Sequence, residues 1–406
     1  MSAGNSEMKL KCVPEDFVVT EVSDRKPAGG VHGLYRLKKA SVGTLEALQT
    51  LQRSWNLAPT SLNHGGLKDR HAVTSQFVTI RNGPRSDFIH ELFSLTYLGQ
   101  TETAFGAADI VGNQFEIVVR SLSEPDCQRI QSRGPLVQTI GFPNYFDEQR
   151  FGSMGASREF IATRWCRKDY EQALWLALAE HNRHDNGAER VQKKILRDLW
   201  GEWKQCKQQL DRSHRRSIVT YLVDHPVGFR KAFALLNENL RGLYLSAFQS
   251  AVWNRMLAKA ICPENQTLVD AHGFSVEVGD CALPFPVPDE TTAVRWPELP
   301  LPSARCKGLD NDMRNLCNES LSHYEMTLEQ MKLSFPRDRW FSRGQRRTVI
   351  VPTDLQLTGA VDERYRGRRK VLLSFTLPRG CYATMLIKAL TAHRDNQETE
   401  IAGESA

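Results

Sequence analysis

The sequence RKVLLSFTLPRGCYATMLIKAL, residues 369–390, predicts a strand over 369–377 followed by a helix over 381–390, close to the end of the chain. A single strand and a single helix bury too little apolar surface to form a core of their own. The strand must therefore join a sheet whose other members lie elsewhere in the sequence.

The first 120 residues supply those members. Helix 43–55 is predicted there because Leu48, Leu51 and Trp55 recur at three- and four-residue spacing. The β-rich runs predicted as strands are KLKCV (9–13), DFVVTEV (16–22), GLYRLKK (33–39), QFVTIR (76–81) and QFEIVVR (114–120), with RRTVIV (346–351) near the other end. This mixture is typical of the α+β class.

The middle of the chain has a different pattern. Helices are predicted over residues 169–181, 191–200 and 244–261, and six prolines between Cys281 and Arg305 predict an extended loop. We therefore expect a discontinuous α+β domain, residues 1–160 and 346–406, interrupted by an inserted helical domain, residues 161–345. Three sequential domains are the alternative, which the small C-terminal piece disfavours.

Composition narrows the class of protein. The 406 residues are 41% hydrophobic and 25% charged, which excludes a fibrous or wholly disordered chain. No run approaches the ~18 apolar residues of a membrane span, and the N-terminus lacks the apolar core of a signal peptide. The nine cysteines are scattered without a C-x-x-C pair, so neither a disulfide framework nor a zinc site is indicated. We expect a soluble, cytoplasmic protein.

Basic residues concentrate in two windows. Residues 181–231 hold twelve Lys and Arg against six Asp and Glu, and residues 337–370 hold ten against four. Each window is thus net +6, equal to the formal charge of the whole chain. Trp340, Phe341 and Tyr365 lie among the charges of the second window. Such patches attract phosphate backbones, and aromatic rings stack on unpaired bases, but a solvated helix face and a basic loop would explain them equally.

The most unusual local sequence is HGGLKDRHAVTSQFVTIR, residues 64–81. Gly65 and Gly66 permit a tight turn or a close backbone approach, Leu67 can anchor the turn in the core, and a strand begins at Gln76. Asp69 would then lie at the rim of a sheet. A single aspartate after a glycine turn is commonly a turn residue bonded to its own backbone, so the residues alone leave its role open.

The same run resembles the catalytic motif of the TruD family of tRNA pseudouridine synthases, G-x-K-D-[KR]-x-A-V-T-x-Q. Further resemblances follow in family order: KCVPEDFVVTEV (11–22), VGNQFEIVVR (111–120), FPNYFDEQRFG (142–152), YLSAFQSAVWNRMLAKAI (244–261) and FTLPRGCYATMLIKAL (375–390). The resemblance implies a discontinuous pseudouridine synthase catalytic domain with a mainly antiparallel central sheet, plus an inserted, mostly helical TRUD domain. It also implies an enzyme that isomerises uridine in tRNA, at position 13.

The reaction explains why a carboxylate is needed. Forming pseudouridine breaks the C1′–N1 bond, joins C5 to C1′ and removes the C5 proton, without electron or phosphoryl transfer. One ionised carboxylate can start it by covalent attack or by abstracting a sugar proton. We therefore expect Asp69 to be the catalytic residue. We expect no cofactor and no metal, since the sequence has no nucleotide-binding glycine loop and no metal-ligand cluster.

The resemblance also implies substrate-binding residues. Lys11 matches the family's active-site lysine, and a nearby cation would keep a sheltered carboxylate ionised. Asn144 would bond near the catalytic aspartate, and Phe146 would stack against the uracil. Arg150 would pair with a phosphate or with a core carboxylate. From the residues alone, Lys11 could be an edge-strand lysine and Phe146 a core residue.

Two departures from the family pattern are local. Asp147 replaces a glycine, so a positive φ there would be strained, and Cys381 replaces a serine. The expected partner is a tRNA, with no membrane and no obligate protein partner. Two other functions stay open: a non-catalytic RNA-binding or RNA-folding protein that retains the cleft, and a nucleoside or glycoside hydrolase that uses Asp69 with a second acid.

Overall fold

The computed structural model describes residues 8–261, 274–285, 296–336 and 340–391. These residues form two compact units, the first from residues up to Phe142 and from Ile350 onward, the second within residues 143–349. The chain crosses between them at β8 (Phe142–Pro143) and β13 (Val349–Ile350), two short strands that pair with each other. The sequence analysis expected these crossings near residues 160 and 345.

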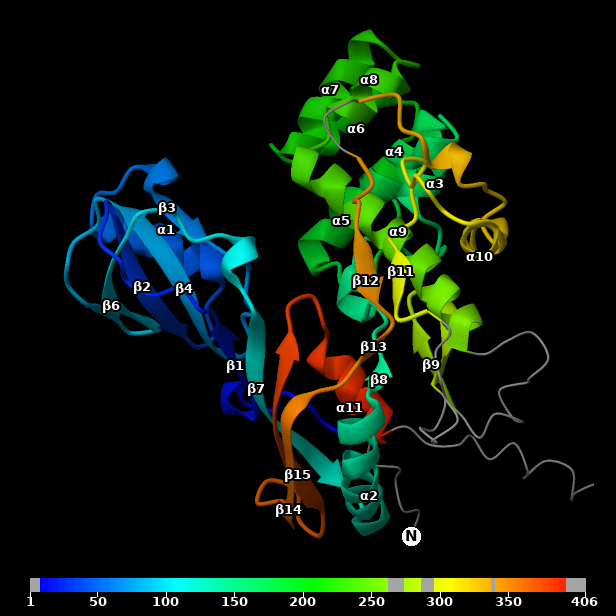
Figure 1. Ribbon diagram of the computed structural model, residues 1–406. Coiled ribbons are helices and arrows are strands. Elements are labelled where there is room, and N and C mark those ends of the chain that lie inside the picture. Colours follow the sequence, from blue (N-terminus) through cyan, green and yellow to red (C-terminus); the bar gives the residue numbers. More distant parts are fainter. Residues whose placement is uncertain (1–7, 262–273, 286–295, 337–339, 392–406) are drawn as a thin grey trace, which may run out of the picture. The chain divides into compact units, whose positions relative to one another are not determined.

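A nine-stranded sheet forms the centre of the first unit, with strand order β14-β15-β7-β1-β4-β2-β6-β5 and β3 paired to β4 (Figure 1). Neighbouring strands are antiparallel except β1 and β4, which are parallel. The strands are β1 (Phe17–Val22), β2 (His32–Lys39), β3 (Leu62–His64), β4 (Val73–Arg81), β5 (Phe88–His90), β6 (Phe93–Thr101), β7 (Gly112–Leu122), β14 (Thr353–Val361) and β15 (Arg369–Pro378). The sheet is therefore mainly antiparallel, as predicted.

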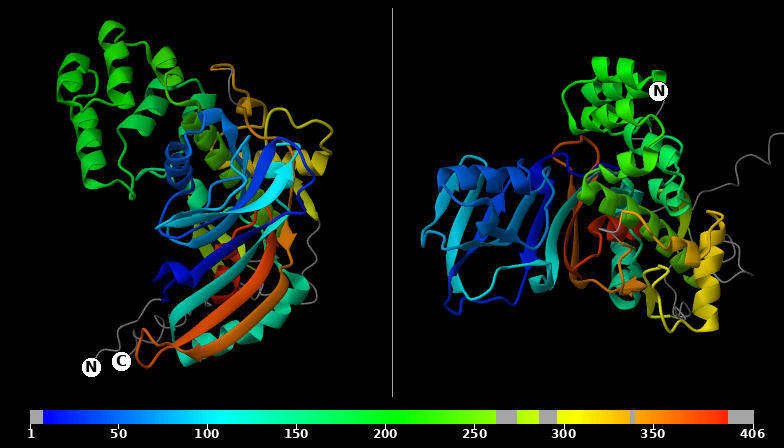
Figure 2. Two further views of the ribbon diagram at one scale, coloured as in Figure 1. Left: turned by 90° about the vertical axis from the view of Figure 1, so that its left-hand side faces the viewer. Right: turned by 90° about the horizontal axis from the view of Figure 1, so that it is seen from above.

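The C-terminal strand β15 joins this sheet between β14 and β7. Its alternate residues Val371, Leu373, Phe375 and Leu377 are buried, as the period of a strand with one core-facing side requires. The register places Phe375 opposite Phe115, and their rings stack with centroids 5.3 Å apart. Figure 2 shows the strands of this sheet rotated progressively from one end to the other, the usual twist of a large sheet.

Helices cover the sheet at both ends. Helix α1 (Thr44–Ser54) buries Leu48 and Leu51 in the core formed by β2, β4 and β6. Helices α2 (Glu124–Ile140) and α11 (Ala383–Thr391) pack on each other, and α2 packs on β14 and β15. The sequence analysis missed α2 because Gly134 and Pro135 interrupt its helical pattern. Packing requires the glycine, since a Cβ at Gly134 would lie 2.1 Å from the side chain of Leu357.

The second unit is mostly helical and is built on α9 (Glu238–Ile261). Phe248, Val252, Trp253 and Met256 have no exposed surface, so this helix is buried nearly all round. Helices α3 and α10 pack on α9, and the others follow from α3 in the packing order α4, α8, α7, α6, α5. Their bounds are α3 (Ile161–Cys166), α4 (Tyr170–Leu178), α5 (Gly187–Asp198), α6 (Trp203–Gln209), α7 (His214–Asp224), α8 (Phe229–Ala234) and α10 (Asn311–Ser322).

The proline-rich stretch after α9 contains short strands in the part that is described. Two two-stranded sheets form here. One pairs β9 (Phe274–Val278) with β10 (Cys281–Phe285), and the other pairs β11 (Glu298–Pro300) with β12 (Gln345–Arg347). Pro284 and Pro300 lie in them, where a missing N–H costs no central ladder. The rest of the predicted loop, residues 286–295, lies outside the described residues. No helix in the described ranges is long and apolar enough to cross a membrane.

The N-terminal segment differs from the prediction. Residues 9–13 do not form a strand: Lys9 makes an isolated bridge to Arg120, Lys11 has φ of 54°, and the 3₁₀ helix η1 (Pro14–Asp16) follows. Beyond the two backbone hydrogen bonds between Lys9 and Arg120, the segment is attached to the sheet in another way.

That attachment is a buried ion-pair group around Arg120 on β7. The guanidinium donates to both carboxylate oxygens of Asp16 at 2.8–2.9 Å and to Asp362 Oδ1 at 3.1 Å. Its hydrogen bonds to Asp16 raise the pKa of Arg120 despite burial. Burial would raise the pKa of Asp362, but backbone N–H donors and Arg120 lower it. The charges of this group therefore stabilise one another.

Arg120→Met should lower the free energy of unfolding by about 3–5 kcal/mol, because Asp16 and Asp362 would remain buried without their cation. Urea unfolding followed by circular dichroism measures this loss. Arg70→Met is the control, since the Arg70–Glu46 ion pair is half exposed and such pairs contribute up to about 1 kcal/mol. Equal stability of the two variants would contradict the role of Arg120.

Candidate functional site

Asp69 lies in the loop of residues 65–72, which joins β3 to β4 at a split in the sheet. One edge of β4 pairs with β1 over residues 73–75 and with β3 over residues 78–80. Between these stretches, the backbone N–H of Phe77 donates instead to Glu21 Oε1 at 2.9 Å. The carboxylate of Glu21, 1% exposed, thus takes the place of a strand partner.

Two polar side chains fix the backbone of the loop. Gln76 Nε2 donates to the carbonyl oxygen of Gly66 at 3.0 Å, and Thr44 Oγ1 donates to Gln76 Oε1 at 2.9 Å. The backbone N–H of Lys68 donates in turn to Thr44 Oγ1 at 3.0 Å. Because Gln76 and Thr44 are buried, their bonds are not exchanged for bonds to water. The loop is therefore ordered by its attachment to β4 and α1.

Lys39 fixes the backbone of Asp69 from the buried side of the loop. Its ammonium, 1% exposed, donates to the carbonyl oxygens of Val42 at 2.8 Å and of Asp69 at 2.7 Å. Burial lowers the pKa of Lys39 to about 8, although the charge of Asp69 opposes this change. The sequence analysis missed Lys39. The alternation along β2 could have revealed it, because Lys39 lies on the same side of the strand as the buried Tyr35 and Leu37.

The two oxygens of the Asp69 carboxylate have different partners. Oδ1 accepts a hydrogen bond from the backbone N–H of His71 at 3.0 Å, and Oδ2 accepts one from the ammonium of Lys11. Burial would raise the pKa of Asp69, but Lys11 and the His71 N–H together lower it below its ordinary value. The side chain is 33% exposed. Asp69 is thus both a turn residue and an accessible, ionised carboxylate.

Lys68, beside Asp69 in sequence, serves the fold. Its ammonium lies 3.1 Å from Glu21 Oε2 and donates to Asn113 Oδ1 at 2.6 Å. Glu21 belongs to the first motif and Asn113 to the G-N-x-F motif. One lysine, with a side chain that is 12% exposed, therefore joins three motifs that are far apart in the chain.

One expectation for the loop, the apolar anchor at Leu67, needs correction. Leu67 does not anchor the turn in the core, because its side chain is 63% exposed; Ala72, fully buried, takes the core position instead. Gly65 has an ordinary negative φ and is needed for close approach, since a Cβ there would lie 2.5 Å from the side chain of Ile110. The loop is positioned by polar bonds, so an apolar anchor at Leu67 is unnecessary.

The other predicted site residues lie in the second unit. Asn144 is 2% exposed; its Nδ2 donates to the carbonyl oxygen of Arg347 at 2.9 Å, and its Oδ1 accepts from Arg346 at 2.7 Å. Phe146 is 8% exposed, with the Arg346 guanidinium 4.0 Å from its ring centroid. Arg150 lies 5.4 Å from the same centroid and donates to the hydroxyl of Ser246.

The structure therefore forms two groups: Lys11 with Asp69, and Asn144 with Phe146 and Arg150 around Arg346. Asp147 has φ of −94°, so the strain expected from replacing glycine is absent; its side chain accepts from the Glu148 N–H. Within the described residues, no three His, Cys, Asp or Glu side chains form a group that could bind a metal. The substrate-binding roles stay predictions.

Comparison with known proteins follows this geometry. The family model for tRNA pseudouridine synthase D (TruD) matches residues 1–281 and 289–390. The chain belongs to the TruD family. A tRNA pseudouridine synthase D of Leptospira interrogans is 30% identical over 94% of this chain and 95% of its own length. One from Aquifex aeolicus is 27% identical over 95% and 98%.

A solved structure from Methanosarcina mazei that carries the TruD name shares the fold. Its TM-score is 0.70 at 23% identity, over 95% of this chain and 93% of that one. Together with the sheet and helices described above, it confirms the predicted α+β class with a helical insertion. TruD membership confirms the resemblance seen in the motifs and the predicted enzyme class, an isomerase.

Lys39→Met should lower the free energy of unfolding by about 1–3 kcal/mol, because buried carbonyl groups, including that of Asp69, lose their donor. Urea unfolding measures this, and Lys38→Met, which changes the exposed neighbour, should have little effect. The pKa of Lys39 falls from 10.5 unfolded to about 8 folded, so the wild type binds fewer protons when folded. Its advantage over Lys39→Met should grow as pH rises from 8 to 10.5. A constant difference would contradict this.

Proposed function

We propose that this chain converts uridine to pseudouridine in tRNA, at position 13, and that Asp69 is the catalytic carboxylate. Membership of the TruD family and the names of its relatives support a tRNA substrate, and we propose the cytoplasm as the location of the enzyme. One observation carries the choice of residue: the Asp69 side chain is a third exposed, yet paired with Lys11 in a loop fixed by buried bonds.

The chemistry needs an anionic and reachable carboxylate. The His71 N–H orients the group, and Lys11 keeps it ionised. After Asp69 attacks the nucleoside or removes a sugar proton, the C1′–N1 bond breaks and C5 bonds to C1′; the bond to Asp69 is then broken, or the sugar proton returns from Asp69 to the ribose. The C5 proton leaves and N1 gains a proton, so substrate and product have the same composition. The Lys11 ammonium can offset the negative charge that the detached uracil carries.

Residues of the second unit are proposed to bind the RNA. Phe146 is 8% exposed and its ring already has a cation against it; aromatic rings are the side chains on which unpaired bases stack. Arg150 adds a guanidinium beside that ring, and the bond from Arg346 fixes the amide of Asn144. We propose that Asn144 and Phe146 contact the flipped uridine, and that Arg150 contacts a phosphate.

Asp69→Asn tests the catalytic role while keeping the size of the side chain. RNA labelled with tritium at uridine C5 should release tritium to solvent with the wild type, without free uracil. The variant should lose at least ~10³-fold in rate, because a nucleophile or base has been removed. Arg70→Met, which alters the next residue, is the control and should keep most activity.

The same assay separates the other functions. An RNA-binding or RNA-folding protein would bind tRNA and release no tritium, whereas a hydrolase would release free uracil. Either result from the wild type would overturn the proposal. Wild-type activity in Asp69→Asn would leave the reaction class intact and remove Asp69 from it.

Lys11→Met should move the acidic limb of the kcat/KM profile to higher pH. Without Lys11, the effect of burial would raise the pKa of Asp69. As the pH falls, Asp69 would then be protonated at a higher pH than in the wild type. Rates measured between pH 4 and 8 would show the shift. Lys9→Met is the control, because Lys9 is an exposed lysine two residues away. An unchanged limb in Lys11→Met would contradict the pairing.

A further inference from the structure

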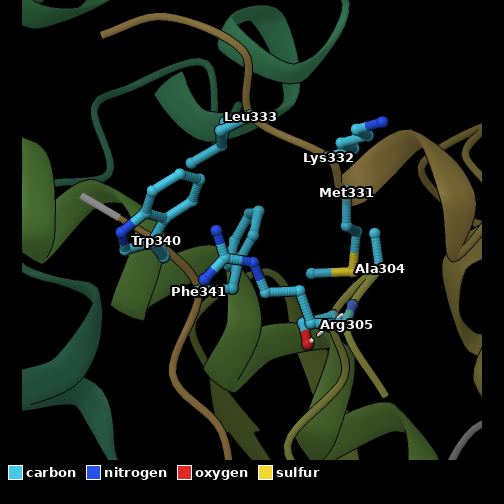
Figure 3. Close-up of a pocket in the computed structure, with 8 residues that line it drawn as sticks. Ala304, Arg305, Met331, Lys332, Leu333, Trp340 and Phe341 are labelled. Atoms are coloured by element: carbon cyan, nitrogen blue, oxygen red, sulfur yellow. Dashed lines mark hydrogen bonds between the residues drawn. The ribbon is translucent and has the colours of Figure 1, made fainter. Parts of the chain in front are cut away.

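A cavity of about 220 Å³ lies in the second unit, away from the residues assigned above (Figure 3). Buried Met331, Leu333 and Phe341 line it, and Trp340, Arg305 and Lys332 complete the wall. Its volume lies below the ~300–1,000 Å³ of clefts for drug-sized ligands. A single base is therefore a better match than a larger ligand.

Trp340 and Arg305 form a stack at this cavity. The guanidinium carbon of Arg305 lies 3.5 Å from the centroid of the Trp340 ring, and the indole is still 45% exposed. In Figure 3 the two side chains face each other beside Phe341, and Lys332 lies across the cavity from Trp340. Indole rings and guanidinium planes are both surfaces on which unpaired bases stack.

Two other cavities of the second unit hold ion pairs, although Arg158, which lines both, is within ion-pair distance of none of the described carboxylates. In a cavity of about 380 Å³, Arg164 pairs with Glu159 and Arg167 with Glu325. In one of about 260 Å³, a carboxylate of Glu148 pairs with an arginine.

At the Trp340 cavity, by contrast, none of the described carboxylates lies within ion-pair distance of Arg305 or Lys332. Their charge is therefore available to an anion.

The walls are fixed by a buried residue of α9. Gln249 Nε2 donates to the carbonyl oxygens of Pro302 at 3.0 Å and Ser342 at 2.9 Å. These carbonyls lie close in sequence to Arg305 and Trp340, so one side chain joins both walls. A preformed site loses less entropy when a ligand binds.

We propose that this cavity binds one unpaired nucleotide of the RNA substrate, with its base on the Trp340–Arg305 stack and its phosphate beside Arg305 and Lys332. The proposal rests on the RNA substrate proposed above and adds a second contact, apart from the reacting uridine. An aromatic base fits the exposed indole, and a phosphate fits the unpaired cations.

Binding of a fluorescently labelled oligouridine to the full chain, measured by anisotropy, tests the site. Trp340→Ala and Arg305→Met should each weaken binding by roughly 5- to 150-fold, the range for loss of one stacked base. Trp340→Phe keeps a ring and should retain most affinity. Oligouridine should quench the tryptophan fluorescence of the wild type. This quenching should be smaller in Trp340→Phe, which would show that the base contacts Trp340.

Arg314→Met is the matched control, because Arg314 also belongs to the second unit, lies outside both basic windows, pairs with Glu329 and does not line the cavity. It should bind oligouridine like the wild type. With tRNA, Trp340→Ala should raise KM for tritium release and leave kcat unchanged, since the contact is made equally in ground and transition states.

Three outcomes would overturn the site: wild-type binding and KM in both Trp340→Ala and Arg305→Met, an equal loss in Arg314→Met, or displacement of oligouridine by oligoglutamate of the same charge. The last result would indicate an acidic protein segment as the ligand. The binding assay needs no catalysis, so a protein that binds oligouridine at Trp340 but releases no tritium would refute the proposed function alone.

Discussion

An acid group that remains ionised while partly withdrawn from water needs a cation close by, and this chain provides it from 58 residues away. Lys11 and Asp69 meet because both of their segments are attached to the same sheet, one through Arg120 and the other through Gln76 and Lys39. The positions of the two charges are thus a property of the whole first unit. Electrostatic pairing at the site and stability of the fold cannot be separated.

Polar residues of the family motifs bond to one another and to distant parts of the first unit. Several of their polar residues bond to other parts of the fold: Lys68 joins Glu21 to Asn113, and Arg120 joins the N-terminal segment to the sheet. Asp69 is an exception because its carboxylate remains accessible. The motif residues of the first unit therefore include the proposed catalytic Asp69 and others whose bonds hold the segments around it in place.

The sequence allowed the sheet and the catalytic candidate to be predicted, since alternation in β15 and the motif resemblance are both local signals. It did not allow α2 to be predicted, because Gly134 and Pro135 obscure its helical pattern and the compensating contact with Leu357 is distant in the chain. Lys39 was missed for a related reason. A lysine in phase with buried residues signals an internal charge, but only folding shows which carbonyls it meets.

The buried ion pairs also affect how this protein can diverge. Substituting one residue of the Lys68–Glu21 ion pair leaves the other charge without its partner in the interior. Substitutions at these two positions are therefore tolerated mainly when both residues change together. The same holds for Arg120 with Asp16. Among distant homologues, these columns should covary, and a neutral couple of matching volume is the natural route by which a lineage could lose both charges together.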